Sequence, residues 1–521
     1  MPIQVLDCTL RDGGYVNNFS FSKDCVADIV TLLEQSKVEF IEIGFLKNTK
    51  EANQTTIFSC FDEFNFLHQC KKQHSYYVAM IVYGKFDVDK IPKKEETIID
   101  CIRVTFKKNE ITQAIQFIKL VKDKGYMVSA NPTGINDYSN EELLELVNLI
   151  NKTNFDMFAI VDTLGVLTSK QLLQIFELLN KKLKNNIKIC FHSHNNLQLS
   201  FSNACELIDY STERNIIVDS SCKGMGRGAG NLCTELILFY LNSNYHATYN
   251  LIPILQIIDK YIEPLSHIYD WGYTLPYYIA SIHNCHPNYA IYLSNKQKLT
   301  AEQINNILMK IPDNQKNNYN EKLIQQLYLS SQNISFDDTY TLEYLQTLIQ
   351  NRRVLIIGPG VSIDKNKEHI VTFIKEENPF IIMLNFHTDN YKSDLVFVNN
   401  QKRFNTLDKT NLKIMITSNI IANNITNLVL DYNKYLGDSH DCGDNTLVVL
   451  LNVLINIKCK DIFIAGCDGY DINSVNYADT LSEHITDIAD RLNMNRVIAN
   501  NLKKLRQFAN IKFITRSKYD I

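Results

Sequence analysis

Short apolar runs alternate with longer amphipathic segments through residues 1–240. In the segment 23–35, Val26, Ile29 and Leu33 recur at three- and four-residue spacing, which predicts a helix with one buried face. The segment 141–151 follows the same spacing and predicts another such helix. The apolar runs have the length of strands and lie at 3–7, 40–45, 77–82, 100–105, 126–130, 157–161, 187–191 and 215–219.

Eight strands that alternate with helices are typical of a (β/α)8 barrel, a fold of the α/β class. A doubly wound open sheet is the competing arrangement, because it also alternates strands with helices. The count of eight, and the polar residues that end several of the strands, favour the barrel. We therefore predict a TIM barrel over residues 1–250.

The rest of the sequence predicts further parts. Residues 251–335 have a mostly helical pattern and are expected to cap the barrel mouth, and residues 336–351 are expected to be a linker. Beyond the linker, buried-strand patterns at 354–357, 380–384, 394–398, 413–416, 427–430 and 461–465 alternate with helical segments. This alternation predicts a smaller Rossmann-like α/β domain over residues 352–521.

The composition is that of a globular protein and excludes some partners. Of 521 residues, 45% are hydrophobic and 21% are charged, and the net charge is −4. Because lysine and arginine form no basic block, the sequence has no electrostatic footprint for nucleic acid or for an anionic membrane. The N-terminus has no signal-peptide pattern, and no uncharged apolar stretch reaches the ~20 residues that span a bilayer. We therefore expect a cytoplasmic protein whose cysteines are mostly small buried side chains.

The first predicted strand ends in Asp7-Cys8-Thr9-Leu10-Arg11-Asp12-Gly13-Gly14. Residues just past the carboxyl end of a barrel strand point into the active site. A carboxylate such as Asp12 can bind a cation there, and an adjacent Arg11 can stabilise an enolate oxygen. The glycines let the backbone approach a ligand closely.

The seventh predicted strand ends in His192-Ser193-His194-Asn195-Asn196. Residues i and i+2 of a strand face the same side, so both imidazoles can reach one metal ion. The first and seventh strands are close neighbours in a closed barrel, so Asp12 can complete the site. Two histidines and a carboxylate suit Mn²⁺, Fe²⁺, Co²⁺ or Zn²⁺ and tolerate Mg²⁺. We expect Mn²⁺ first.

A glycine-rich stretch at 219–235 follows the last predicted strand and precedes a helix. It has two interpretations. One is a phosphate-binding loop at a helix N-terminus. The other is a tight turn that places Asn231 at the metal.

With these motifs the sequence resembles the DRE-TIM metallolyases, the superfamily of hydroxymethylglutaryl-CoA lyase, isopropylmalate synthase and 4-hydroxy-2-oxovalerate aldolase. The matching stretches lie at 7–14, 41–44, 161–165, 192–196 and 224–235, in the family's order and spacing. The resemblance implies that Asp12, His192 and His194 bind the metal and that Asn231 is a fourth ligand.

The resemblance also implies catalytic roles for other residues. Arg11 would stabilise the enolate, Glu42 would be an active-site acid, and Thr163 would face the substrate. One position departs from the family, because 4-hydroxy-2-oxovalerate aldolases have a histidine base where this chain has Tyr15. A tyrosine with an ordinary pKa near ~10 is a poor base at neutral pH, although it can donate a proton or a hydrogen bond.

The proton-transfer group therefore has several candidates, and they are Tyr15, Glu42, His283, His286 and Tyr289. For the last three, a structural role in the cap is the alternative.

These motifs predict a divalent-metal-dependent aldolase, a carbon–carbon lyase. It would form or cleave an aldol bond between a 2-oxo acid such as pyruvate and an aldehyde through a metal-stabilised enolate. One alternative is an acyl-CoA/2-oxo acid condensing enzyme similar to isopropylmalate synthase. Another is a non-catalytic protein that binds a nucleotide sugar. Because barrel enzymes of this type often self-associate, we expect a homo-oligomer.

The second domain has a candidate site of its own. Gly358-Pro359-Gly360-Val361-Ser362 follows a buried strand, so it can hold a phosphate, although an ordinary strand-to-helix turn is the alternative. A later strand leads to Gly466-Cys467-Asp468. These strings distantly resemble a Rossmann-like domain of pterin pyrophosphokinase-like and bacterial sialyltransferase-like proteins. The resemblance implies a nucleotide or nucleotide-sugar site at Gly358, Gly360, Ser362 and Asp468, and a role in surface-carbohydrate biosynthesis.

Overall fold

The computed structural model describes residues 3–520 except 73, 211, 297, 351, 424–425, 427, 438–442 and 472–487. The chain divides into two compact units. The first comprises Met1–Asn288 with Asp313–Tyr319, and the second comprises Tyr289–Pro312 with Asn320–Ile521. The division falls inside the segment that the sequence assigns to the helical cap, and the predicted domain boundaries themselves stay predictions.

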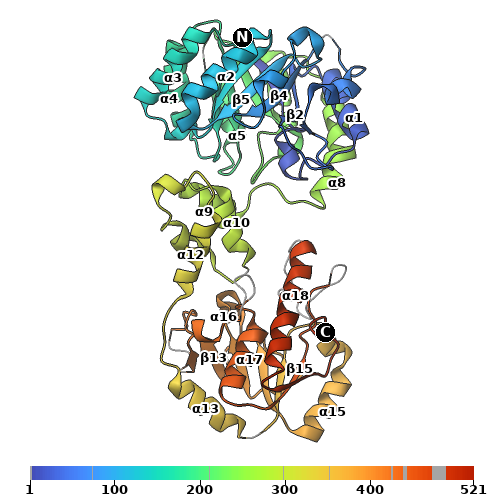
Figure 1. Cartoon of the computed structure of the whole chain (residues 1–521), viewed down its shortest axis with the longest axis vertical. Helices are drawn as coiled ribbons and strands as arrows, with labels where there is room; N and C mark the ends of the chain where they lie inside the picture. The colour runs from blue at the N-terminus through green and yellow to red at the C-terminus, as the bar shows by residue number, and fades with distance from the viewer. Residues whose placement is uncertain are drawn as a thin grey trace. The chain divides into compact units, whose positions relative to one another are not determined.

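Eight parallel strands close into a barrel in the first unit (Figure 1). They follow the order β1-β9-β8-β7-β6-β5-β4-β2, and β1 also pairs with β2, which closes the ring. The strands are β1 (Ile3–Asp7), β2 (Phe40–Leu46), β4 (Tyr76–Val82), β5 (Cys101–Phe106), β6 (Met127–Pro132), β7 (Met157–Asp162), β8 (Lys188–Ser193) and β9 (Ile216–Ser220). A two-residue strand, β3 (Ile57–Phe58), pairs with the end of β2 at the rim of the ring. The closed ring confirms the predicted TIM barrel and excludes the open sheet.

Helices surround this ring. They are α1 (Lys23–Gln35), α2 (Ile111–Asp123), α3 (Asn140–Thr153), α4 (Ser169–Lys182), α5 (Ser200–Asp209), α6 (Thr234–Tyr245), α7 (Leu251–Ile257) and α8 (Glu263–Ser266). Helix α1 begins at Lys23 because the Ser22 side chain accepts a hydrogen bond from the Cys25 N–H, and it buries Val26 and Ile29 against the barrel. The connection from β4 to β5 departs from the pattern, because two short 3₁₀ turns, Val88–Lys90 and Lys94–Glu96, take the place of a helix.

The barrel interior has an apolar layer and, above it, a charged layer. The apolar layer includes Phe40, Cys101 and Ile217, all fully buried. Two residues further along the same strands come Glu42, Arg103 and Asp219, which therefore face the same interior one layer nearer the carboxyl ends. All three are at most 1% exposed. The carboxyl half of the barrel is thus polar, which is where such barrels place their active sites.

The second unit contains a seven-stranded parallel sheet in the order β14-β13-β12-β11-β10-β15-β16. Its strands are β10 (Val354–Ile357), β11 (Phe380–Leu384), β12 (Leu395–Val398), β13 (Ile414–Thr417), β14 (Val429–Leu430), β15 (Asp461–Ala465) and β16 (Asn510–Phe513). The order reverses between β10 and β15, as in a Rossmann-like fold. This confirms the predicted second α/β domain. The sequence did not predict β16, because this edge strand is only partly buried and its apolar signal is weak.

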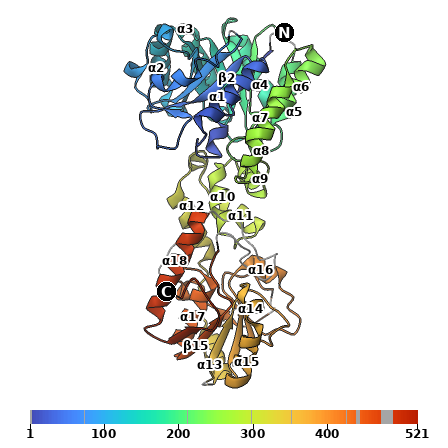
Figure 2. The same ribbon diagram turned by 90° about the vertical axis from the view of Figure 1, so that its right-hand side faces the viewer.

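Helices cover both faces of this second sheet (Figure 2). One face packs on α13 (Thr339–Ile349), α17 (Thr446–Asn456) and α18 (Ile488–Leu505), and the other packs on α14 (Ser362–Lys365), α15 (Lys367–Glu377) and α16 (Gln401–Thr406). Because both faces are covered, the strands read as continuous apolar runs such as Val354-Leu355-Ile356-Ile357. Helices α9 (Leu275–Ile282), α10 (Pro287–Asn295), α11 (Ala301–Leu308) and α12 (Glu321–Gln332) lie between the barrel and the second sheet in the sequence.

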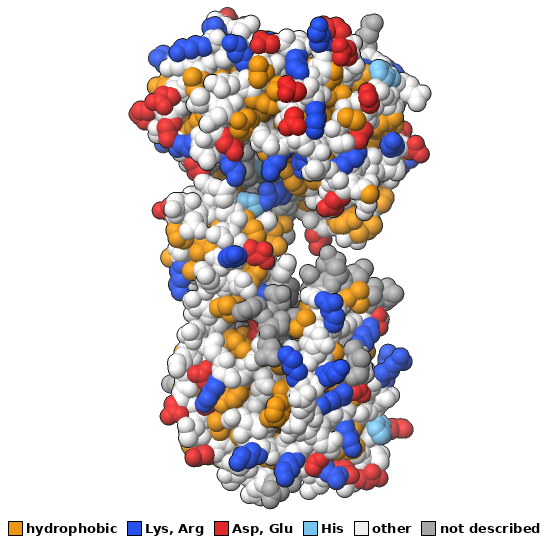
Figure 3. All heavy atoms as spheres, in the orientation of Figure 1, with side chains coloured by type: hydrophobic (Ala, Val, Ile, Leu, Met, Phe, Trp, Pro, Cys, Tyr) orange, Lys and Arg blue, Asp and Glu red, His pale blue; other side chains and the backbone are white. Residues whose placement is uncertain are grey.

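Two surface properties bear on partners. In the described part of the chain, no helix is both long and apolar enough to cross a membrane. On the face shown in Figure 3, acidic and basic side chains are interspersed over the barrel rather than gathered by sign. This distribution agrees with the absence of a basic block in the sequence.

Candidate metal centre and active site

The barrel brings Asp12, His192 and His194 together at the carboxyl ends of its strands. Asp12 lies in the turn after β1, His192 lies in β8, and His194 follows the end of β8. One ligand atom from each residue lies within 4.8 Å of the others. The two imidazole rings are 5.1 Å apart and nearly perpendicular. The three predicted ligands therefore converge on one point, a geometry that a single cation can share.

The glycine-rich stretch after β9 brings Asn231 to the same point. Asn231 pairs with His194 as an isolated β-bridge, and its Nδ2 donates to Asp12 Oδ2 at 2.8 Å. Its Oδ1 is buried and has no hydrogen-bond partner among the described residues. A Cβ on Gly226 would lie 2.3 Å from Asn231 Nδ2, so this approach requires glycine. The geometry favours the interpretation as a tight turn over the interpretation as a phosphate loop.

The charge states of these residues fit a metal site. Burial raises the pKa of Asp12, but the Arg11 guanidinium and the two imidazoles outweigh it and hold this pKa well below its usual range. Burial lowers the pKa of His194 to about 4, so its imidazole is neutral at pH 7 and keeps a lone pair. A carboxylate, two imidazoles and the orphaned amide oxygen of Asn231 form a mixed oxygen–nitrogen set, which suits a divalent transition metal.

A chain of ion pairs runs through the barrel from Asp12 to His192. Arg11 donates from Nη1 to Asp12 Oδ1 at 2.5 Å and from Nε to Glu42 Oε2 at 2.6 Å. Arg103 then donates to Glu42 Oε1 at 3.2 Å and to Asp219 Oδ2 at 2.5 Å. Asp219 Oδ2 lies 3.1 Å from His192 Nδ1. Opposite charges therefore alternate between two of the candidate metal ligands.

Sequence reasoning did not single out Arg103 or Asp219 as functional residues. The available signal for Arg103 is a lone charge in the apolar strand Cys101–Phe106, because a buried charge needs a partner. Burial raises the pKa of Asp219, but Arg103 and His192 outweigh it and keep the carboxyl ionised. An ionised Asp219 beside Nδ1 favours a proton on that nitrogen and leaves Nε2 of His192 for a metal.

The predicted catalytic residues have distinct environments. Tyr15 is 42% exposed, and its ring packs edge-on against Phe19 and Phe45. Desolvation of its hydroxyl and the nearby Asp12 carboxylate raise the pKa of Tyr15 above its ordinary value. The Thr163 hydroxyl accepts a hydrogen bond from the Gly134 N–H at 2.9 Å, which ties the loops after β6 and β7 together.

The three candidates from the cap region differ from one another. His286 lies in the first unit, where its Nε2 contacts Arg227 Nη2. Tyr289 belongs to the second unit, is fully buried, and accepts a hydrogen bond from the Asn320 N–H at 3.0 Å. His283 ends α9. Tyr289 thus has the structural role that the sequence left open.

The family model described as HMGL-like matches residues 2–259, which cover the whole barrel. The barrel domain of this chain belongs to the HMGL-like family. The motifs that carried the resemblance, with the closed barrel, place it among the DRE-TIM metallolyases.

Named relatives match a part of the chain similar in length to the HMGL-like match. A 4-hydroxy-2-oxovalerate aldolase of Geobacillus genomosp. 3 is 25% identical over 266 residues, which are 50% of this chain and 77% of the relative. The protein of the same name from Shewanella halifaxensis is 25% identical over 262 residues, 50% of this chain and 76% of its own. Among solved structures, the N-terminal domain of a protein provisionally named an aldolase, from Bacteroides vulgatus, is 26% identical. It has a TM-score of 0.48 and covers 56% of this chain and 96% of its own.

Outside the HMGL-like barrel, the second unit brings its four predicted site residues together. The Gly360 N–H donates to the Gly466 carbonyl at 2.8 Å, which joins the turns after β10 and β15. The Ser362 N–H and hydroxyl both donate to the Asp468 carboxylate, the former at 2.8 Å. A Cβ on Gly360 would lie 2.6 Å from Asp468 Oδ2. A carboxylate of the chain itself therefore takes the hydrogen bonds that a phosphate would need.

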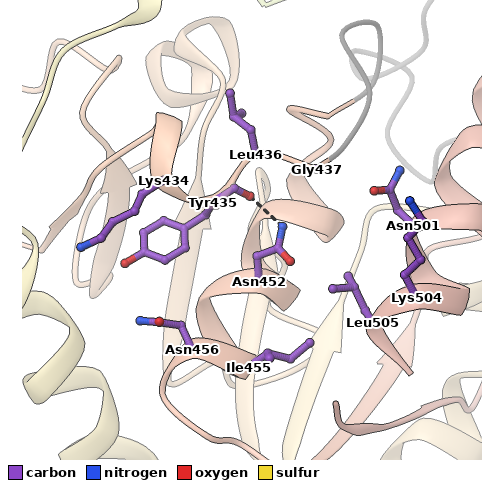
Figure 4. A pocket seen from close by; sticks show the side chains of 10 residues that line it. All are labelled: Lys434, Tyr435, Leu436, Gly437, Asn452, Ile455, Asn456, Asn501, Lys504 and Leu505. Atoms are coloured by element: carbon purple, nitrogen blue, oxygen red, sulfur yellow. Dashed lines mark hydrogen bonds between the residues drawn. The ribbon is translucent and has the colours of Figure 1, made fainter. Parts of the chain in front are cut away.

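A separate cavity of about 370 Å³ lies elsewhere in the second unit (Figure 4). Residues of α17, residues of α18 and residues 434–437 line it. In its wall, Asn452 Nδ2 donates a hydrogen bond to the Tyr435 carbonyl at 2.9 Å. Its polar lining residues include Lys434 and Lys504. None of the four predicted nucleotide-site residues lines this cavity.

Proposed function

We propose that the HMGL-like barrel is a divalent-metal-dependent aldolase. It would form or cleave an aldol bond between a 2-oxo acid, with pyruvate as our first choice, and an aldehyde. The observation that most supports this proposal is that Asp12, His192 and His194 converge beside Arg11. The names of the relatives support an aldol reaction, at an identity that leaves the substrates open.

Arg11 is suited to stabilise an enolate oxygen. Its Nε and Nη1 are engaged by Glu42 and Asp12, and Nη2 has no hydrogen-bond partner among the described residues. A fixed guanidinium that still has free donors stabilises negative charge without reorganising at the moment of reaction. Arg11 is only 5% exposed, which strengthens this electrostatic effect.

The other residues of the candidate site would bind the metal ion, position the arginines and donate a proton or a hydrogen bond. When bound, the divalent ion would act as a Lewis acid on the carbonyl of the 2-oxo acid, and Mn²⁺ is our first choice among the divalent metals that the mixed donor set suits. Glu42 positions Arg11 and Arg103 rather than acting as a free base, because both of its oxygens are engaged. Tyr15 stays protonated at neutral pH, so it serves as a hydrogen-bond or proton donor to the aldehyde oxygen.

Other parts of the hypothesis rest on the sequence alone. Nucleotide or nucleotide-sugar binding by the second unit stays a prediction, and the engagement of Asp468 with Ser362 weakens it. A homo-oligomeric state, a cytoplasmic location and a role in surface-carbohydrate biosynthesis are likewise predictions.

Exchange of the pyruvate C3 protons in deuterated water, with added Mn²⁺, tests the proposal without knowledge of the aldehyde. We expect exchange with the purified full chain. Replacement Arg11→Ala should slow it by about 10²–10³-fold, because it removes the donor to the enolate oxygen. Manganese content, measured by elemental analysis, should persist in that variant.

Exchange at an unchanged rate in Arg11→Ala would contradict the role of Arg11. Exchange of the methyl protons of an acyl-CoA, without exchange of pyruvate, would favour the condensing enzyme. If the protein retains no stoichiometric divalent ion and Mn²⁺ produces no exchange, the non-catalytic alternative would stand.

A further inference from the structure

Arg227 lies in the glycine-rich turn, between the candidate metal ligands and the cap segment of the first unit. On one side, a Cβ on Gly226 would contact Asn231 and would lie 3.0 Å from Asp12 Oδ2. On the other side, a Cβ on Gly228 would lie 3.6 Å from Tyr277 Cε1 in α9. The backbone of Arg227 is therefore fixed at the boundary between the metal-ligand group and the cap.

The Arg227 side chain reaches the cap and remains close to the site. Its Nη2 contacts His286 Nε2 and lies 3.4 Å from Asn288 Oδ1. Its positive charge is near enough to influence the pKa of Tyr15 and of His194. The guanidinium thus lies between the cap residues that it contacts and the turn that carries Asn231.

The charge of Arg227 has no acidic partner among the described residues. Arg11 and Arg103 each bind two carboxylates, whereas Arg227 contacts the uncharged side chains of His286 and Asn288. Burial, followed by the charge of Arg227, lowers the pKa of His286 to about 3, so the imidazole is neutral and can accept a hydrogen bond from the guanidinium. A half-buried guanidinium without a counter-ion favours an anionic ligand, which it can bind through a two-pronged hydrogen bond.

We propose that Arg227 determines acceptor specificity by binding a carboxylate or phosphate group on the aldehyde substrate. This proposal rests on the proposed aldol reaction. Arg11 is buried beside the candidate metal ligands, where the 2-oxo acid would bind, whereas Arg227 is half-buried and contacts the cap residues His286 and Asn288. The proposal places the aldehyde on that side of the site. The expected acceptors are therefore short aldehydes with an anionic group at the far end.

Two pairs of aldehydes of matched length test the proposal. A comparison of succinic semialdehyde with butanal isolates the effect of a carboxylate. A comparison of glycolaldehyde phosphate with glycolaldehyde isolates the effect of a phosphate. With pyruvate and Mn²⁺, kcat/KM of the wild-type chain should favour one anionic aldehyde over its neutral match by about tenfold or more, as a charge-assisted hydrogen bond would provide. The pair with the larger preference identifies the anionic group.

Replacement Arg227→Met should abolish that preference, and Arg227→Lys should retain part of it because the positive charge remains. Exchange of the pyruvate C3 protons should persist in both variants, since it does not involve the aldehyde. Loss of exchange in Arg227→Met would place Arg227 in enolate formation and would overturn the proposal. Equal use of anionic and neutral aldehydes by the wild-type chain would overturn it as well.

A binding measurement separates this proposal from the proposed function. Calorimetry with succinate and with phosphoglycolate, both unreactive, should show binding to the wild-type chain that weakens by about tenfold or more in Arg227→Met. If this difference appears without any pyruvate exchange, the anion site stands and the aldolase proposal fails. If both ligands bind the two proteins equally, Arg227 is not an anion site.

Discussion

At the scale of single residues, the charged layer inside the barrel decides what the site can do. Glu42, Arg103 and Asp219 are buried, and charges at such depth are tolerated only with partners of opposite sign. Their contacts connect Arg11, which would face the enolate, to His192, which would bind the metal. This buried charged layer therefore holds both ends of the candidate active site.

Asp219 should control metal affinity through His192. The replacement Asp219→Asn removes the charge that favours a proton on Nδ1, so we expect Mn²⁺ to bind about 10–100-fold more weakly, as for other outer contacts of metal ligands. Isothermal calorimetry measures the affinity. Asp7→Asn is a matched control, because Asp7 is equally buried at the end of β1 but binds Thr9 and Thr234. Equal Mn²⁺ affinity in the Asp219 variant and the wild type would rule out this role.

At the scale of elements, the strands and barrel helices follow from local pattern, and the turns that follow them do not. The spacing of Val26 and Ile29 predicted α1, which the structure confirms over Lys23–Gln35. The turn after β9 had two interpretations in the sequence. Its contacts with Asn231 and Asp12 come from segments far apart in the chain, so local pattern had no means to choose between them.

The close approach at Gly226 gives a test of this turn. In Gly226→Ala, the new Cβ would collide with the Asn231 amide and displace it from Asp12, so we expect about tenfold weaker Mn²⁺ binding. Gly84→Ala is the control, because Gly84 has a positive φ but its Cβ would meet nothing within 4 Å. That control should cost about 1–2 kcal/mol of unfolding free energy through backbone strain, with metal affinity unchanged. A Gly226 variant with wild-type Mn²⁺ affinity would show that Asn231 is not a ligand.

At the scale of the whole molecule, two units with separate cores share one chain. The barrel and the second sheet have separate hydrophobic clusters, and the candidate metal ligands all belong to the first unit. A ligand that binds only one folded unit stabilises that unit by mass action. Metal removal should therefore affect the two units unequally.

Differential scanning calorimetry with and without a chelator tests this expectation. At free Mn²⁺ of 100 times Kd, binding adds about 2.7 kcal/mol to the stability of the barrel, so EDTA should lower the Tm of one transition and leave the other in place. His192→Ala should already have the lower Tm and should not respond to EDTA. A chelator that shifts both transitions of the wild type equally would contradict a metal site confined to the barrel.

The sequence by itself determined the barrel, the second α/β domain and the choice of Asp12, His192 and His194 as candidate metal ligands, because these depend on residue periodicity and on motifs that end strands. Only the tertiary structure decided which polar residues pair with one another inside the two units. Arg103 meets Asp219 across 116 positions of sequence, and Asp468 takes the hydrogen bonds of Ser362 across 106. Local pattern encodes where a strand ends, whereas closure of the barrel and assembly of the second sheet determine which distant charges become neighbours once water is excluded.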